Sequence, residues 1–303
     1  MKNLSRSFAA GLLVCFLFSS VLFAGRQHEE THQYGGIEKV KIKLVLGNCL
    51  INKSKDKTVH IKVVHTYDED DFEARFNEKG KTLHIKEKLY GHNNGGYSDW
   101  TISVPDGIEI DFETATGSLE ISGVKDVEID GNSGTGSLEV MDAEGSFKLN
   151  TGTGSIEVAD TKGELDLNSG TGRVKVYDCT GGFDVNSGTG GVYAKNITIE
   201  NDADFNSGTG DAEVTKPLGD DFDLSLNSGT GDAVLDMDGQ PIKGYYEFTV
   251  NSRRGRIDSP VEFDDVEEYD DGNEEYVRKS FTKGGKTPRY YISSGTGTAE
   301  LKR

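Results

Sequence analysis

The sequence predicts an all-β protein: a single-stranded parallel β-solenoid with an N-terminal β region and a C-terminal hairpin-like cap. The first observation is a motif, Asn-Ser-Gly-Thr-Gly or a close variant, whose final glycines lie at positions 117, 136, 154, 172, 190, 210, 231 and 255. Self-similarity at a period of about 18 residues is typical of solenoids. The second observation is that apolar and polar residues alternate between the motifs, as in strands with one buried face.

The composition agrees with this architecture. Of 303 residues only 34% are hydrophobic, fewer than a compact globule usually carries, whereas the core of a solenoid is a column only one coil wide. The net charge is −19, and residues 105–303 hold 18 basic and 40 acidic residues. Such a surface disfavours nucleic acid and anionic membranes, because phosphate binding requires clustered Lys and Arg.

The N-terminus has the pattern of an export signal over residues 1–24. Lys2 and Arg6 precede an apolar stretch that ends at Phe23, and Ala24 is a plausible cleavage point. Cys15 lies inside the apolar stretch rather than at its end, so lipid attachment is not expected. No later apolar run is long enough to cross a bilayer. The predicted location is therefore the periplasm or the cell surface.

Residues 25–104 are predicted to form an N-terminal β-strand region. Residues 26–34 are polar and are interpreted as a leader without regular structure. Alternating patterns predict strands at 37–46, 58–64, 82–88 and 100–104, with a loop at 91–96. Cys49 lies here and Cys179 in the repeats; export would permit a disulfide between them, but two separate buried thiols are favoured.

Residues 105–255 are predicted to form the stacked coils, each with two short strands. Leu165/Leu167 and Val174/Val176 are the expected inward pairs of one such coil, and Val234 is expected to face outward. A coil buries about four apolar side chains, so no coil is stable alone. The rule for parallel crossovers favours right-handed winding. A column of asparagines is expected to form an amide ladder along the stack: Asn132, Asn150, Asn168, Asn186, Asn206, Asn227 and Asn251.

Residues 256–303 are predicted to form an acidic insertion and a C-terminal cap. Ten acidic residues and no Lys or Arg occur between Asp258 and Glu275. Strands are expected at 276–281 and 289–293, joined at Gly284-Gly285. A final Ser-Gly-Thr-Gly at 294–297 returns to the repeat, so the insertion is interpreted as a hairpin or an edge cover.

The segment 104–110, Val-Pro-Asp-Gly-Ile-Glu-Ile, followed by tandem coils with apolar-Glu-Val strands, resembles the bacterial adhesin-like β-solenoid domains of unknown function. The resemblance covers about residues 35–303, and the family includes relatives from envelope-stress operons. It implies a β-solenoid fold and supplies no catalytic residues to transfer. The acidic run at 258–275 departs from the family's pattern.

Catalytic, metal and cofactor sites are not expected. The Gly-x-Gly motifs lead into strands, whereas phosphate binding needs a helix N-terminus, and the coils lack the repeat of calcium-binding rolls. All six histidines lie between His28 and His92; His60, His65 and His84 are interpreted as solvated rather than zinc ligands. A nucleophilic serine would be singular, but these serines repeat. The enzyme alternative is a polysaccharide-active β-helix, which would need loops that these short coils lack.

Two groups of surface residues are candidate binding sites. Glu120, Glu139 and Glu157 are expected to stack in one column, and Asp166, Asp184 and Asp204 in another, where Ca²⁺ or Mg²⁺ would bind weakly and without specificity. The candidates for partner binding are acidic and aromatic residues near the C-terminus: Tyr245, Tyr246, Asp264, Asp265, Tyr269, Asp270, Asp271, Tyr276, Tyr290 and Tyr291.

The sequence thus predicts an exported, non-catalytic, adhesin-like envelope protein that acts as a binding or scaffolding module. The expected partner is a protein or cell-wall component with positive charge, held through residues 245–291. For the tyrosines alone, capping of the open end of the stack is the competing interpretation. The alternative functions are a component of an envelope-stress response and, less favoured, a polysaccharide-active enzyme.

Overall fold

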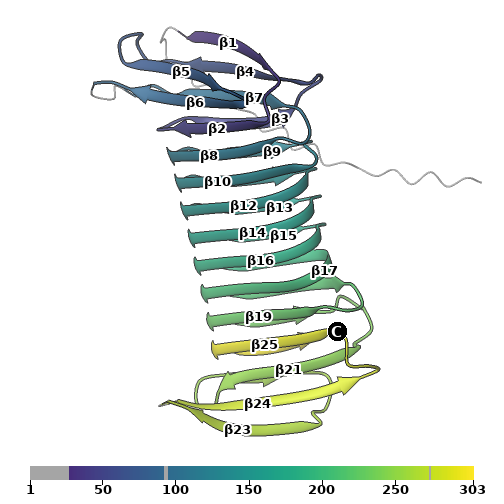
Figure 1. Ribbon diagram of the computed structural model, residues 1–303. Helices are drawn as coiled ribbons and strands as arrows, with labels where there is room; N and C mark the ends of the chain where they lie inside the picture. The colour runs from purple at the N-terminus through teal and green to yellow at the C-terminus, as the bar shows by residue number, and fades with distance from the viewer. Residues whose placement is uncertain (1–26, 92–94, 273) are drawn as a thin grey trace, which may run out of the picture.

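The computed structural model describes residues 27–91, 95–272 and 274–303, so the predicted export signal and Cys15 lie outside the described residues. The described residues form 26 strands and contain no helix. The strands stack into one long column, with the N-terminal strands at one end and strands β21, β23 and β24 at the other (Figure 1). The prediction of an all-β solenoid is confirmed.

Each regular coil consists of one long strand and one short strand, except that β17 runs without a break through a short position and the long position that follows it. Every long strand pairs in parallel with the long strand of the next coil, and the short strands do the same. In the middle coil, β14 (Lys162–Thr171) is followed by β15 (Val174–Tyr177). The remaining coil strands are β8 (Glu109–Thr116), β9 (Leu119–Ser122), β10 (Val127–Thr135), β11 (Leu138–Met141), β12 (Glu144–Thr153), β13 (Ile156–Ala159), β16 (Thr180–Thr189), β17 (Val192–Thr209), β18 (Ala212–Leu218), β19 (Asp223–Thr230) and β20 (Ala233–Asp236).

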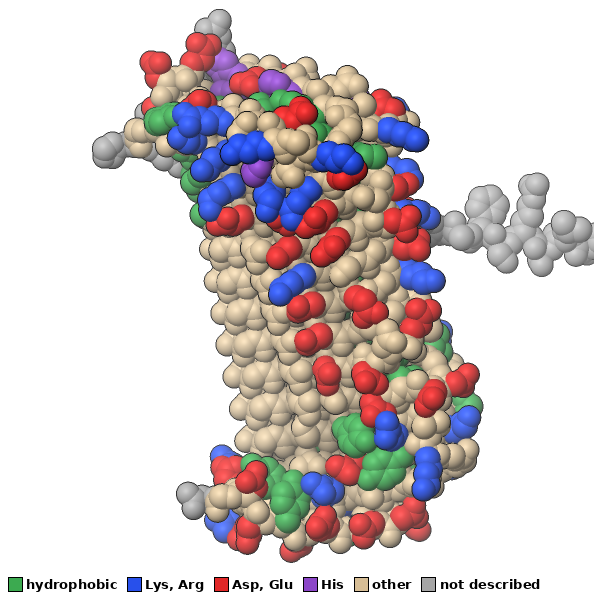
Figure 2. Space-filling model, in the orientation of Figure 1, with side chains coloured by type: hydrophobic (Ala, Val, Ile, Leu, Met, Phe, Trp, Pro, Cys, Tyr) green, Lys and Arg blue, Asp and Glu red, His purple; other side chains and the backbone are tan. Residues whose placement is uncertain are grey.

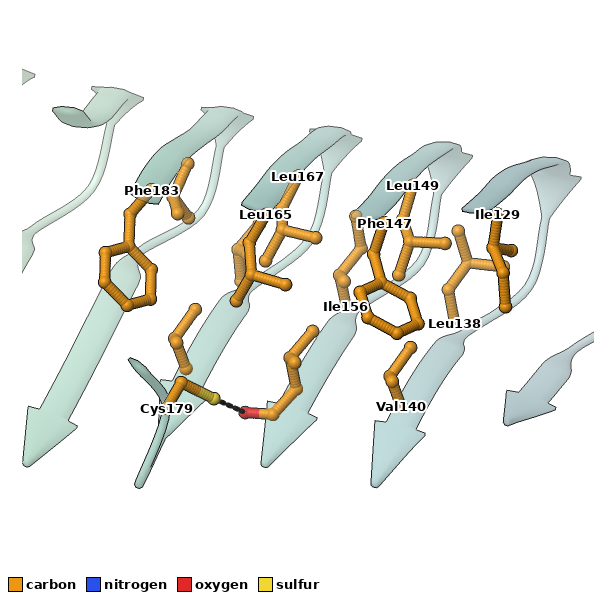
Figure 3. Close-up of a cluster of buried hydrophobic side chains, with 14 of the residues drawn as sticks. Ile129, Leu138, Val140, Phe147, Leu149, Ile156, Leu165, Leu167, Cys179 and Phe183 are labelled. Atoms are coloured by element: carbon orange, nitrogen blue, oxygen red, sulfur yellow. Dashed lines mark hydrogen bonds between the residues drawn. The ribbon is translucent and has the colours of Figure 1, made fainter. Parts of the chain in front are cut away.

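The core is the apolar column predicted from the alternation. Leu149, Leu167 and Val185 occupy equivalent positions in successive coils and are fully buried. Figure 3 shows side chains of this column pointing inward from the long strands toward those of the short strands. Cys179 lies at the edge of this column, where its thiol donates to the carbonyl oxygen of Val158 at 3.8 Å. Both Cys49 and Cys179 are buried and free, so the expectation of two separate thiols is confirmed.

Two different corners turn the chain within each coil. At the first corner, the final glycine of the motif adopts a positive φ, +153° at Gly172, and a Cβ there would lie 1.9 Å from the carbonyl oxygen of Gly154 in the preceding coil. The inward Ser169 hydroxyl donates to that same carbonyl at 2.8 Å. At the second corner, an aspartate such as Asp160 in one coil or Asp178 in the next adopts the left-handed conformation, which short polar side chains tolerate.

The asparagine column forms only part of the expected ladder. Asn150 donates to Asn132 at 3.1 Å and Asn206 donates to Asn186 at 3.0 Å. Asn168 instead donates to Asp166 on its own strand, because that carboxylate is a closer and charged acceptor. Asn251 does not belong to the column, since its strand is offset by two residues relative to the repeat.

The N-terminal region adds a coil and a small two-layered cap. β2 (Lys39–Leu44) and β3 (Asn48–Lys53) stack directly on β8 and β9. The predicted strand at 37–46 corresponds to β2, whereas β3 was not predicted. Outside them lie β1 (His28–Gly35), β4 (Thr58–His65), β5 (Phe72–Lys79), β6 (Thr82–Leu89) and β7 (Ser98–Val104). The prediction of an unstructured leader at 26–34 was wrong, because β1 pairs with β4 along its whole length.

At the opposite end, the C-terminal strands insert into the stack. β25 (Arg289–Thr296) pairs with β19 on one side and with β21 (Gly244–Asn251) on the other. β26 (Thr298–Lys302) likewise lies between β20 and β22 (Arg256–Asp258). β23 (Asp265–Asp271) and β24 (Glu274–Lys283) form an antiparallel hairpin that covers β21. Val234 is 7% exposed rather than facing solvent as predicted, so the repeat has become irregular here.

Candidate functional site

A groove lined by carboxylates runs along the face formed by the long strands. Its volume is about 510 Å³, and its lining residues come from successive long strands, β8 to β17. Figure 2 shows acidic side chains following one another down this face. The acidic lining residues are Glu109, Asp111, Glu128, Asp130, Glu164, Asp166, Asp184, Asp202 and Asp204. Parallel pairing at about 4.8 Å spacing brings these like charges together.

The predicted column of Asp166, Asp184 and Asp204 lies within this groove. The three residues are register partners on β14, β16 and β17. At the N-terminal end of the groove the carboxylates have lysine partners, as where Lys41 lies 2.7 Å from Asp111. Lys148 is 4.0 Å from Asp166, and no Lys or Arg pairs with Asp184 or Asp204 among the described residues. The negative charge is therefore least compensated at Asp184 and Asp204, toward the C-terminal end of the groove.

The second predicted column lies on the short strands. Glu139 is the register partner of both Glu120 and Glu157. Glu139 is half-buried, and burial followed by repulsion from Glu120 and Glu157 raises the pKa of its carboxyl group. Glu157 is relieved by Lys175, whose Nζ lies 3.4 Å away. Stacking thus places Glu139 in the least favourable electrostatic position of the column.

Neither column forms a defined metal site. No group of three or more His, Cys, Asp or Glu side chains in the described part of the chain is arranged to hold a metal ion. Weak and non-specific association of cations with the columns stays a prediction.

The six tyrosines near the C-terminus divide into two roles. Tyr246 and Tyr290 are almost fully buried and stack on each other with ring centroids 4.5 Å apart. Burial raises the pKa of Tyr246 to about 12. These two rings belong to the core that closes the end of the column, so they cannot contact a partner. Tyr245 and Tyr291 are half-buried and meet edge to face at 6.2 Å.

The remaining pair, Tyr269 and Tyr276, lies on the outer hairpin. Their rings stack at 5.6 Å, and the guanidinium of Arg278 lies 4.9 Å from the centre of the Tyr269 ring. On the outermost strand, β23, Val266 is 58% exposed. The carboxylates of Asp265, Asp270 and Asp271 are exposed here as well, while Asp264 accepts a hydrogen bond from the backbone N–H of Thr282 at 2.9 Å. The hairpin therefore presents the tyrosine pair on one face and Val266 on the other, with exposed carboxylates on both faces.

The structure corrects one prediction about the histidines. His60 and His84 are partly exposed, but His65 is only 4% exposed, so its interpretation as a solvated residue was wrong. The reason is that β1 and β5, neither of which was predicted, cover the end of β4. The polar sequence of β1 gave little alternation from which this strand could have been found.

The chain matches a known family over most of its length. A family model described as Toastrack DUF4097 matches residues 37–265. The chain belongs to this family. The match confirms the resemblance to adhesin-like β-solenoid domains of unknown function. No curated protein matches the sequence.

Solved structures similar to this Toastrack protein share little sequence with it. A candidate adhesin from Parabacteroides merdae is 12% identical, with a TM-score of 0.43 over 92% of this chain and 97% of that chain. A candidate cell adhesion protein from Clostridium sporogenes is 15% identical, with a TM-score of 0.27 over 91% and 99%. A candidate lipid binding protein from Parabacteroides distasonis is 12% identical, with a TM-score of 0.39 over 92% and 98%.

Proposed function

We propose that this Toastrack protein is an exported, non-catalytic module that binds a basic protein or cell-wall component at the cell envelope through its C-terminal cap. The observation that carries the proposal is the surface of the β23–β24 hairpin. There the stacked Tyr269 and Tyr276 lie among carboxylates on one face, and the exposed Val266 lies among carboxylates on the other. The partly exposed aromatic rings and the exposed Val266 supply contact area, and surrounding negative charge attracts a basic partner.

The position of this hairpin supports its assignment to binding. The coils repeat the same few side chains, so one coil differs little from the next. The hairpin lies outside the repeat, and its outer strand β23 pairs only with β24 among the described strands. Glu268, Asp270 and Asp271 form no ion pair there with a described residue, in contrast to Glu274 and Glu275, which pair with Arg254 and Arg253. The unpaired carboxylates are therefore available to a ligand.

A non-catalytic role is supported by the state of the repeated serines. The Ser187 hydroxyl is buried and donates to the carbonyl oxygen of Gly172 at 2.8 Å, and the equivalent serines do the same in other coils. A hydroxyl committed in this way is neither exposed nor next to a base, as a nucleophile must be. The alternative of a polysaccharide-active enzyme is tested by incubating the protein with uronic-acid polymers, since an enzyme would release unsaturated sugars.

Export rests on the sequence of residues 1–24, and the proposed organisation follows the boundaries predicted above, at residues 25–104, 105–255 and 256–303. No helix in the described part of the chain has the length and apolar character needed to span a membrane.

Affinity capture from the native cell envelope tests the proposed function. The immobilised protein should retain a basic protein or wall component, and moderate salt should release it, because exposed charges are screened over about 8–10 Å at physiological ionic strength. Capture of a regulatory protein of the envelope-stress response would favour that alternative. Retention of acidic partners only, or release that does not depend on salt, would contradict the proposal.

A further inference from the structure

Two histidines from neighbouring strands stack against each other at the N-terminal end of the column. His28 on β1 and His65 on β4 are direct register partners, and their ring centroids lie 5.0 Å apart with the planes inclined by 10°. The His65 ring also stacks on Phe72, with ring centroids 3.9 Å apart. His65 is 4% exposed, and its Nδ1 has no hydrogen-bond partner among the described residues. The pocket is therefore built for an aromatic, neutral ring.

Strand β1 depends on a small number of contacts. None of its eight residues is fully buried, and the only strand with which it pairs among those described is β4. Besides that pairing, it is held by the ion pair of Glu29 with Lys62 at 2.9 Å, by a hydrogen bond from Gln33 to Thr58 at 3.2 Å and by ring contacts. The closest of these ring contacts places His32 at 4.0 Å from Phe76 on β5. An edge strand with so little buried surface is the part of a fold that opens most easily.

The groups around His65 offer little compensation for a positive charge. From β1 it is faced by His28 and Glu30, from the following loop by Tyr67 and Glu69, from β5 by Phe72, and from β7 by Ser98. Glu30 and Glu69 are exposed, and Glu69 lies 3.8 Å from His28 rather than from His65. Glu87 on β6 is buried nearby, but its carboxylate is already bound by the Ser98 hydroxyl and by the backbone N–H groups of Val45 and Leu46.

We propose that the stacked pair of His28 and His65 is an acid-sensitive latch, and that protonation of the pair releases strand β1 and uncovers the edge of β4. A charged His65 would lose solvation in its pocket, and a charged His28 stacked upon it would repel it. Release removes both penalties at once, because both rings then reach water. The rest of the column stays folded, since its coils contain no histidine.

The direction of the pH dependence follows from burial. Burial, and next the charge of His28, lower the pKa of His65 from its ordinary value of 6.5. The released strand therefore takes up protons more readily than the closed strand. The closed state has its full stability above about pH 6.5, which is the ordinary pKa of histidine. Its stability declines as the pH falls from there toward the lowered pKa of His65.

Hydrogen exchange measured by mass spectrometry, corrected for the intrinsic pH dependence of exchange, tests the latch. Between pH 7.5 and pH 5, protection of the β1 amides should fall by up to about tenfold per pH unit for each proton taken up. Protection of the β14 amides should stay constant. Equal corrected protection of β1 at the two pH values would overturn the proposal.

Three variants make the test specific. His65→Phe keeps a ring in the pocket but cannot be protonated, so protection of β1 should become independent of pH. If that variant fails to fold, His28→Gln removes the ring that stacks on His65 together with its charge, and the loss of β1 protection on acidification should become smaller. His84→Gln removes a partly exposed histidine of the same cap and should behave as the wild type does. The same acid-induced loss in His65→Phe, or an undiminished loss in His28→Gln, would show that other groups open β1.

Discussion

At the scale of single residues, position in the stack decides what a side chain contributes. Leu167 is fully buried between equivalent core residues, Leu149 and Val185, whereas Glu157 lies ten residues earlier on an exposed face. Alternation in the sequence was sufficient to assign both, because a strand with one buried face has a strict period of two. It could not reveal that His65 is buried, because β1, which covers His65, is polar and shows no such alternation.

Leu167→Asp should destabilise the column strongly. A carboxylate placed in a dry core should lower the free energy of unfolding at least as much as truncating a buried leucine does, which is about 2–5 kcal/mol. Glu157→Gln should change stability by less than about 1 kcal/mol, since it breaks an exposed ion pair with Lys175 and relieves part of the repulsion on Glu139. Thermal unfolding of the two variants measures the difference. Equal shifts in Tm would contradict the assignment of Leu167 to the core and of Glu157 to the solvent-exposed face.

Glu139→Gln should raise the Tm at pH 7. The pKa of Glu139 is raised in the folded state by burial and by its two neighbouring glutamates, so the folded protein holds its proton more tightly than the unfolded chain does. The ionised group therefore destabilises the fold above its folded-state pKa. The benefit of the substitution should disappear as the pH falls below the ordinary value of 4.5.

Glu213→Gln is the matched control for this experiment, because Glu213 lies in the same column with Tyr193 and Val234 as its neighbours. An equal gain in Tm from the control, or a gain from Glu139→Gln that persists at pH 4, would argue against repulsion within the column.

At the scale of the coil, the two corners explain why the motif is so regular. The final glycine of each motif must both adopt a positive φ and leave room for the carbonyl group of the coil before it. The sequence predicted the first requirement. It could not show the second requirement or the role of the serine, because both depend on contacts between residues about 15 to 18 positions apart.

Gly172→Ala separates these two requirements when compared with Gly239→Ala. Gly239 has a φ of +79°, but no atom lies within 4 Å of the position that a methyl group would take, so its substitution should cost about 1 kcal/mol from conformation alone. At Gly172 the methyl group would collide with the Gly154 carbonyl, and overpacking adds about 1–3 kcal/mol. Denaturant unfolding measures both. Equal losses of stability in the two variants would show that the close approach of the preceding coil is not the reason why this position requires glycine.

At the scale of the whole molecule, the regular coils lie between two different ends. The coils and their period were predicted from the sequence, since the repeat is explicit. The insertion of β25 between β19 and β21 could not be predicted in the same way, because it joins segments more than 60 residues apart. The candidate site was predicted in part: the acidic columns and the acidic hairpin were identified, but two of the six tyrosines proved to be core.

Calcium should stabilise the column slightly. Hard cations prefer carboxylate oxygens, and a ligand present at a concentration equal to its Kd stabilises the folded state by about 0.4 kcal/mol. At millimolar calcium and matched ionic strength, the Tm should therefore rise by about 1 °C for each such site. The triple variant Asp166→Asn, Asp184→Asn, Asp204→Asn should lose this rise. A Tm unaffected by calcium in the wild type would show that solvent and lysines already screen the columns.

The most direct test of the proposed binding surface compares two variants that each lose three negative charges. One neutralises the hairpin, with Glu268→Gln, Asp270→Asn and Asp271→Asn. The other neutralises the coil groove, with Asp166→Asn, Asp184→Asn and Asp204→Asn. Substitution is preferable to deletion of residues 264–275. Asp264 lies beside Ser280, near the far end of β24, so a deletion would force Phe263 to connect to Tyr276 across most of the length of that strand.

The measurement is the yield of envelope partner captured by each variant, after thermal unfolding has shown that both remain folded. If the partner binds through the C-terminal cap, the hairpin variant should lose most of the partner that the wild type captures, while the groove variant should retain it. Full capture by the hairpin variant, or loss confined to the groove variant, would contradict the assignment of binding to the C-terminal cap.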